Sequence, residues 1–214
     1  MTLLRAIALA SAALVAFLVH EIAAATVASA LGDRSAVRWG RRSLDPRRHL
    51  DPFGSVLLPL IGVGLAATGS AFPVFAYGTP HPSDPRALRD ARRGPILVAL
   101  AGPTAQLVLA ALAGVVVRSA LLAGSRPVAE IGAAVLWVST TMAVLHLVPI
   151  PGLDGSRILV RFLPARAAEV YRGLDAYLPL FLLVILFVIP GPLLGIVGRL
   201  TALVCGALAG APVC

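Results

Sequence analysis

This chain has few charged residues. Only 13% of its 214 residues are Asp, Glu, Lys or Arg, whereas 58% are hydrophobic. A soluble globular domain carries about 25% charged residues. The chain has too little polar surface to cover a water-soluble body, so the composition excludes an ordinary soluble enzyme. It predicts an all-α polytopic membrane protein.

Lysine is absent altogether: all 18 basic residues are arginine, and the net charge is +8. A nucleic-acid-binding protein would present its basic residues as a stripe on a soluble fold. Here the arginines cluster in short loops between apolar runs, which is the topology signal of a membrane protein. The pattern excludes nucleic acid as a partner and indicates the lipid bilayer. The two cysteines, Cys205 and Cys214, lack the spacing of a metal site.

Several apolar runs are long enough to cross a membrane, which takes about 20 residues. Three of them form the predicted core: residues 3–31, 94–123 and 128–148. A signal peptide is the alternative for the first run, with Ala28-Ser29-Ala30 as its cleavage site. The apolar spans that follow argue against it.

The chain divides into a membrane core, residues 1–165, and a C-terminal transmembrane hairpin, residues 166–214. The hairpin is predicted because the apolar stretch at 176–212 is interrupted by Pro190-Gly191-Pro192. Nothing in this C-terminal part indicates a chemical role.

The arginines also decide how the apolar block 53–79 is arranged. If every block crossed once, the three arginine-rich loops would alternate between the two sides of the membrane. If 53–79 instead enters and returns on one side, all three loops are cytoplasmic. The loops hold 14 of the 18 arginines: Arg34, Arg38, Arg41, Arg42, Arg47, Arg48, Arg86, Arg89, Arg92, Arg93, Arg157, Arg161, Arg166 and Arg172. The second arrangement obeys the positive-inside rule, and the glycines and prolines of 53–79 suit a re-entrant segment.

One histidine is missing where a zinc protease would carry it. Two histidines at i and i+4 of one helix can bind a zinc ion, with the glutamate after the first acting as general base. The first span has His20 and Glu21, but the position four residues after His20 is Ala24. One ligand and the base are present. The alternative is a polar pair in a helix interface.

A second polar signature, Pro149-Ile150-Pro151-Gly152-Leu153-Asp154-Gly155, follows the span at 128–148. Its prolines and glycine break the helix and present Asp154 at membrane depth. A carboxylate oxygen is an acceptable zinc ligand. The alternative role for Asp154 is to cap a helix beginning at Gly155. In the re-entrant topology the first and third core spans run in the same direction, so His20 and Asp154 both lie toward the cytoplasmic side.

Taken together, these blocks resemble the site-2 protease family of intramembrane zinc metalloproteases, in its compact bacterial branch. The resemblance covers about residues 3–165. It rests on His20-Glu21 with Leu31-Gly32-Asp33, His49-Leu50-Asp51-Pro52-Phe53-Gly54, Pro73-Val74-Phe75-Ala76-Tyr77-Gly78, Ala101-Gly102-Pro103, and Pro149-Ile150-Pro151 with Leu153-Asp154-Gly155. It implies a three-helix core with a re-entrant segment, His20 and Asp154 as zinc ligands, Glu21 as the base, and a transmembrane protein as substrate. The expected location is a bacterial inner membrane.

The departures from the family pattern concentrate at the site. Ala24 replaces the second histidine, His146 and Gln106 stand where asparagines are expected, and Gly152 stands where proline is usual. Catalytic zinc normally has three protein ligands. His146 is the candidate replacement, and the alternative is that it hydrogen-bonds broken backbone or lines a polar cavity. His49 is expected to be structural, and His81 to be solvated.

Two functions follow from these residues. The first is an intramembrane metalloprotease homologue, impaired in zinc binding by Ala24 unless His146 repairs the site. The second is a non-catalytic scaffold, a pseudoprotease that recognises transmembrane helices through the same groove. Residues His20, Glu21 and Asp154 motivate the first, and Ala24 motivates the second. The sequence does not decide zinc occupancy, the substrate or the oligomeric state.

Overall fold

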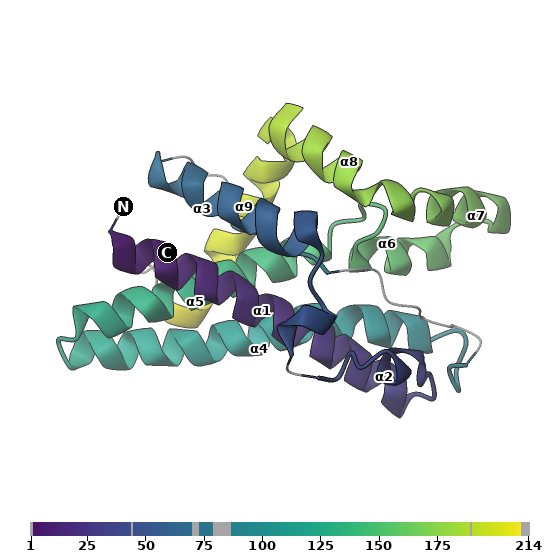
Figure 1. Cartoon of the computed structure of the whole chain (residues 1–214), viewed down its shortest axis with the longest axis horizontal. Coiled ribbons are helices and arrows are strands. Elements are labelled where there is room, and N and C mark those ends of the chain that lie inside the picture. The colour runs from purple at the N-terminus through teal and green to yellow at the C-terminus, as the bar shows by residue number, and fades with distance from the viewer. Residues whose placement is uncertain (1, 44, 70–72, 79–86, 189, 211–214) are drawn as a thin grey trace.

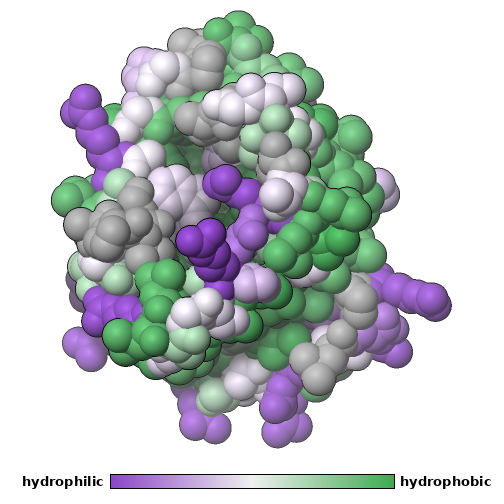
Figure 2. Space-filling view, turned by 90° about the vertical axis from the view of Figure 1, so that its left-hand side faces the viewer, coloured by the Kyte–Doolittle hydropathy of each residue, from purple (hydrophilic) through white to green (hydrophobic). Residues whose placement is uncertain are grey.

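The computed structural model describes residues 2–43, 45–69, 73–78, 87–188 and 190–210, and within these ranges every regular element is a helix. Five helical stretches are long and apolar enough to cross a membrane: Leu3–Ala30, Gly94–Leu122, Arg126–His146, Ala165–Val188 and Gly191–Ala209. Figure 2 shows broad apolar areas on the surface between groups of hydrophilic side chains. The prediction of an all-α polytopic membrane protein is confirmed.

Three long helices form the core: α1 (Leu3–Ala30), α4 (Gly94–Leu122) and α5 (Arg126–His146). They pack against one another along their length (Figure 1). The buried face of α1 is rich in alanine, and small side chains let helix backbones approach closely in a membrane. The observed bounds lie within two residues of the predicted spans.

Helices α1 and α5 run in the same direction. At one end the Thr2 hydroxyl donates a hydrogen bond to Glu130 over 3.2 Å, and toward the other end the His20 and His146 rings stack. Helix α4 lies antiparallel to α5, because only the short turn at 123–125 separates them. The predicted parallel arrangement of the first and third core spans is therefore confirmed.

The block after the first loop folds back beside its own start. A π-helical turn, η2 (Pro52–Leu57), leads into α3 (Leu58–Ala67), and residues 73–78 are extended. Leu50 and Gly78 form an isolated antiparallel bridge, and the Tyr77 amide donates to the Gly54 carbonyl over 3.1 Å. Gly62 lets the Pro73–Val74 backbone approach, because a Cβ on Gly62 would lie 2.9 Å from the Pro73 oxygen. Both ends of the segment therefore lie together, as a re-entrant segment requires.

Short elements connect these parts. The first arginine-rich loop contains α2 (Ser35–Arg38) and η1 (Pro46–Arg48). The polar stretch after Asp154, where the sequence allows a helix to begin at Gly155, forms helices: α6 (Asp154–Leu159), η3 (Val160–Phe162) and α7 (Ala165–Gly173). Alanine and arginine are strong helix formers, which explains helix in this polar sequence.

Two apolar helical stretches complete the chain: η4 (Asp175–Tyr177), α8 (Leu178–Leu183) and η5 (Val184–Val188) in one, and α9 (Pro190–Ala209) in the other. Helix α9 packs on α4 and α5. Gly114 of α4 lets the α9 backbone approach, because a Cβ there would lie 3.0 Å from the Leu208 oxygen. The Arg118 guanidinium donates to the Ala209 carbonyl over 3.1 Å. A positive charge at a helix C-terminus complements the helix dipole.

The main hydrophobic core joins all of these parts. Phe17 of α1, Phe75 of the extended segment, Leu145 of α5, Leu153 of the bend and Leu182 of α8 are all buried in one cluster. Residues 147–153 form a bend between α5 and α6, and Asp154 follows it directly. This bend is therefore packed between the three-helix core and the C-terminal stretch.

Candidate metal centre

His20 occupies a space that a glycine leaves open. It lies on α1 facing α4, and a Cβ on Gly102 would lie 2.2 Å from the His20 Nε2 and Cδ2 atoms. Any larger residue at position 102 would displace the imidazole ring. The Gly102-Pro103 pair of α4 thus makes room for the first candidate ligand.

The bend after α5 turns the chain back on the end of that helix. Gly152 has φ +90°, a left-handed conformation that other residues rarely adopt. Gly155 packs against the α5 terminus, because a Cβ there would lie 2.2 Å from the Leu147 oxygen. Asp154 is the first residue of α6, and the helix has no side-chain cap. The carboxylate is therefore not used as a helix cap.

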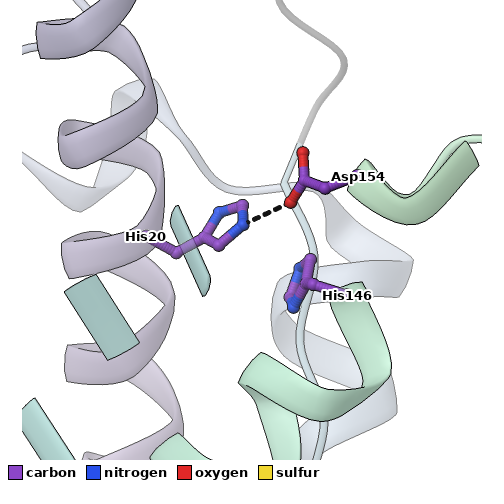
Figure 3. A group of neighbouring side chains, drawn as sticks. All are labelled: His20, His146 and Asp154. Atoms are coloured by element: carbon purple, nitrogen blue, oxygen red, sulfur yellow. Dashed lines mark hydrogen bonds and ion pairs between the residues drawn. The ribbon is translucent and has the colours of Figure 1, made fainter. Parts of the chain in front are cut away.

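Three side chains from these elements converge in one buried group (Figure 3). The His20 Nε2 atom lies 2.7 Å from Asp154 Oδ2. The rings of His20 and His146 stack with centroids 4.1 Å apart and planes 29° apart. One nitrogen or oxygen atom from each of the three lies within 4.8 Å of the other two. Each residue is at most 5% exposed.

The ring orientation of His146 is fixed by its own helix. Its Nδ1–H donates to the Met142 carbonyl over 2.8 Å, and Phe75 packs against the ring at 5.0 Å between centroids. Because Nδ1 carries the ring proton, Nε2 keeps its lone pair. Metal-binding histidines characteristically donate their second ring N–H in this way.

A cavity of about 100 Å³ opens beside the group. Glu21 lines it, and its Oε1 atom lies 3.6 Å from His20 Nδ1. Ala24 lines the same cavity and offers no donor atom. The cavity therefore brings together the proposed base, the candidate ligands and the position that lacks a histidine.

The charges around Asp154 favour its ionised form. Burial raises the pKa of its carboxyl, but the adjacent His20 imidazole and the Arg157 guanidinium lower it by more, so the pKa lies below its usual value. The Arg157 Nη1 atom lies 3.8 Å from Asp154 Oδ1. Metal ligation requires this ionised form.

The remaining residues singled out from the sequence lie elsewhere or play other parts. His49 is fully buried, donates through its Nε2–H to the Ser43 carbonyl over 2.9 Å, and packs edge-on against Phe17. Gln106 donates to the Ala16 carbonyl over 3.3 Å, bridging α4 and α1. His81 lies outside the described residues.

Sequence reasoning missed three residues that line the cavity: Tyr77, Asp175 and Leu178. Tyr77 belongs to one of the motifs that carry the family resemblance, but its place beside the site depends on the return of the re-entrant segment. Asp175 and Leu178 lie in the C-terminal part, where no spacing or motif pointed to them.

The donor set fits zinc. Two imidazole nitrogens and one carboxylate oxygen form a three-ligand catalytic set, to which zinc binds at about 2.0–2.2 Å. Two ligands of one tetrahedral ion are therefore about 3.3–3.6 Å apart. The three atoms lie within 4.8 Å of one another, and His20 Nε2 and Asp154 Oδ2 are 2.7 Å apart, so modest side-chain movements would bring them to the ligand separation. His20, His146 and Asp154 would hold the ion without Ala24.

Comparison with known proteins gives relatives of one kind. The chain is 29% identical over 184 residues to the "Putative zinc metalloprotease YwhC" of Bacillus subtilis, and the match covers 83% of this chain and 78% of that protein. It is 34% identical over 188 residues to the "Putative zinc metalloprotease Rip2" of Mycobacterium tuberculosis H37Rv, and the match covers 83% of this chain and 65% of that protein. The chain thus spans slightly less than two thirds of the Rip2 length.

A Rip2 protein of Mycolicibacterium smegmatis is 34% identical over 151 residues, covering 66% of this chain and 52% of that protein. No family model matches the chain, and no solved structure matches it. YwhC and Rip2 are site-2 protease family members, and the similarity extends over most of the chain. The comparisons therefore show that the chain is similar to members of the site-2 protease family.

Proposed function

We propose that this protein is an intramembrane zinc metalloprotease in which His146 supplies the ligand that Ala24 cannot. The observation that carries the proposal is the convergence of His20, His146 and Asp154, with ligand atoms within 4.8 Å of one another. The hydrogen bond from His146 Nδ1–H to Met142 supports it, because it leaves Nε2 available for a metal.

The chain's own residues have distinct tasks in this proposal. A bound zinc ion would supply Lewis acidity and lower the pKa of water to about 7. The Glu21 carboxylate takes a proton from the attacking water and returns it to the leaving amine nitrogen. The buried Asp154 carboxylate contributes negative charge to the cation site, and the surrounding apolar core limits access of bulk water to the about 100 Å³ cavity.

The proposed substrate is a transmembrane protein segment that unwinds locally. A helix hides its peptide carbonyls in hydrogen bonds, so only an unwound segment can present one to Glu21. The similarity to putative zinc metalloproteases and the five apolar helices among the described residues support cleavage within a membrane. The arginine-rich loops support a bacterial inner membrane with the site toward the cytoplasm.

A second candidate function is a non-catalytic homologue that binds transmembrane helices. Ala24 favours it, because the cavity wall offers no donor atom at that position. The direct His20–Asp154 ion pair also favours it, because the pair satisfies both groups without a metal.

Zinc content per purified chain tests the proposal. We expect about one zinc in the wild type, none in His146→Ala, and an unchanged content in His81→Gln, the matched histidine deletion. A wild type without zinc, together with zinc in Ala24→His, contradicts the proposal and supports the non-catalytic homologue. Zinc retained in His146→Ala removes His146 from the ligand set.

Activity needs a separate test. A transmembrane reporter peptide with a tag at each end should be cleaved by the wild type in the presence of zinc. Glu21→Gln should retain zinc but lose cleavage, because the amide cannot accept the proton. Zinc binding without cleavage in the wild type supports the non-catalytic candidate.

A further inference from the structure

The segment from Tyr171 to Leu178 contacts the bend that carries Asp154. The Asp175 Oδ1 atom accepts a hydrogen bond from the Gly152 amide over 2.7 Å. The Tyr171 hydroxyl donates to the Pro149 carbonyl. Leu178 packs closely on Gly152: a Cβ added to Gly152 would lie 2.8 Å from the Leu178 Cβ. The C-terminal segment thus contacts the bend at Pro149 and at Gly152.

The bend needs an external contact of this kind. Pro149 and Pro151 have no amide hydrogen, so neither can donate a backbone bond there. Gly152 adopts φ +90°, and glycine is the residue with the greatest backbone freedom. Leu153 donates its amide to the Ile150 carbonyl over 3.0 Å within the bend, whereas the Gly152 amide donates out of the bend to Asp175. The least restrained residue of the bend is therefore fixed from the C-terminal segment.

Asp154 follows Gly152 by two residues, so the conformation of Gly152 sets the direction in which the carboxylate points. Leu153, between them, is buried in the main core. The Asp154 carboxylate reaches His20 across a separation of 134 residues in the sequence. A small rotation at Gly152 would move the carboxylate out of the group formed with the two histidines.

We propose that Asp175 is a positioning residue of the metal centre: by accepting the Gly152 amide it fixes the bend and orients Asp154 toward His20 and His146. The C-terminal stretch is then part of the site, in which it also lines the cavity through Asp175 and Leu178. The inference rests on the proposed function, because it treats Asp154 as a metal ligand. The Gly152–Asp175 contact itself does not depend on a metal.

The competing role for Asp175 is local. It is the first residue of η4, where an acidic side chain stabilises the start of a helix by its charge. The two roles need different properties of the side chain. Positioning needs an acceptor oxygen, which asparagine retains, whereas a charge effect is lost in asparagine. Asp175→Asn and Asp175→Leu therefore separate the two.

The test uses the full-length protein, purified metal-free in detergent, titrated with Co²⁺ and followed by visible absorption. We expect Asp175→Leu to weaken Co²⁺ binding about 10- to 100-fold and to change the absorption bands, as loss of a partner that orients a ligand does. Asp175→Asn should stay within about threefold of the wild type. Glu169→Leu, which removes an exposed carboxylate from the neighbouring helix α7, should leave binding and bands unchanged.

Amide hydrogen exchange of the metal-free protein is the second readout. The peptide that contains residues 150–154 should exchange at least about tenfold faster in Asp175→Leu than in the wild type. In Asp175→Asn its exchange rate should equal that of the wild type. If Asp175→Leu does not fold, Asp175→Ala replaces it, because it removes the acceptor of the Gly152 amide without adding a large apolar side chain. The same two measurements then apply.

The outcomes separate this inference from the proposed function. If the wild type binds no Co²⁺, the proposed function fails, and exchange alone decides whether Asp175 holds the bend. If the wild type binds Co²⁺ and Asp175→Leu matches it in affinity, bands and exchange, the positioning role is wrong. It is also wrong if Asp175→Asn loses as much as Asp175→Leu, because charge would then be the cause.

Discussion

The two halves of the candidate centre are built in opposite ways. On α1, His20 and Glu21 stand on a regular helix whose register is set by 28 residues of continuous structure. On the other side, His146 and Asp154 flank a bend that contains two prolines and a glycine at φ +90°. The regular half contributes one candidate ligand and the irregular half contributes two.

A lost ligand is more readily replaced at the bend than on the helix. A helix offers only positions three or four residues away on the same face, so the loss at Ala24 leaves α1 with no substitute. A bend can bring the end of one helix beside the start of the next. Here it carries the last residue of α5 next to the first residue of α6, and both face His20.

Removing the bend carboxylate should have the largest effect. We expect Asp154→Ala to abolish zinc binding, because two imidazoles alone leave the site short of its three protein ligands. Zinc per purified chain is the measurement, with Glu169→Ala as the matched carboxylate deletion. Full zinc in Asp154→Ala would mean that the bend does not supply the ligands.

The second largest effect is expected from crowding His20 on the helical half of the centre. Gly102→Ala places a methyl group 2.2 Å from the His20 ring, so the ring or α4 must move. We expect a loss of about 1–3 kcal/mol in stability, the usual cost of overpacking, together with weakened metal binding.

Gly198→Ala is the control for that variant, because a Cβ at Gly198 of α9 would have no atom within 4 Å apart from its chain neighbours and the backbone of its own helix. It should be neutral or stabilising by up to about 1 kcal/mol, since alanine favours helix over glycine. Thermal melting in detergent measures both variants. Equal melting temperatures would show that the glycine does not make room for His20.

The third ligand can be moved from α5 back to α1. Ala24→His combined with His146→Asn should bind about one zinc per chain, because an imidazole introduced at position 24 would lie one turn beyond His20 on α1. His146→Asn alone should bind none. A double variant without zinc would show that the cavity at Ala24 cannot accept an imidazole.

The smallest effect is expected at the charge beside the bend. Arg157 is one third exposed at its side chain, and its Nη1 atom lies 3.8 Å from Asp154 Oδ1. Solvent reaches the guanidinium and screens the interaction, and the separation is long for an ion pair. We expect Arg157→Gln to change zinc affinity by less than about tenfold, measured by competition with a chelator. A larger loss would assign the orientation of Asp154 to charge and not to the backbone contact at Gly152.

Much of the membrane core could be predicted from the sequence, because length and polarity fix where a span starts and ends. The apolar runs at 94–123 and 128–148 closely match α4 and α5. The proximity of His20 to Asp154 was predictable for a different reason. Arginine asymmetry fixed the topology, and the topology made two helices parallel.

What could not be predicted depends on contacts between distant residues. Gly152 stands where the family pattern has proline, and only the structure shows why proline would not fit. Its φ is +90°, and its amide donates to Asp175, whereas proline fixes φ near about −65° and has no amide hydrogen. The hydrogen bond that orients the His146 ring has no sequence signature either.

The location of the metal shows whether His146 is a ligand. A structure of the zinc-loaded protein, with the ion identified by anomalous scattering at the zinc edge, should place one ion within about 2.0–2.2 Å of Nε2 of His20, Nε2 of His146 and a carboxylate oxygen of Asp154. A zinc ion bound by His20 and Asp154 with the His146 ring turned away, or no ion at all in this cavity, would contradict the proposal.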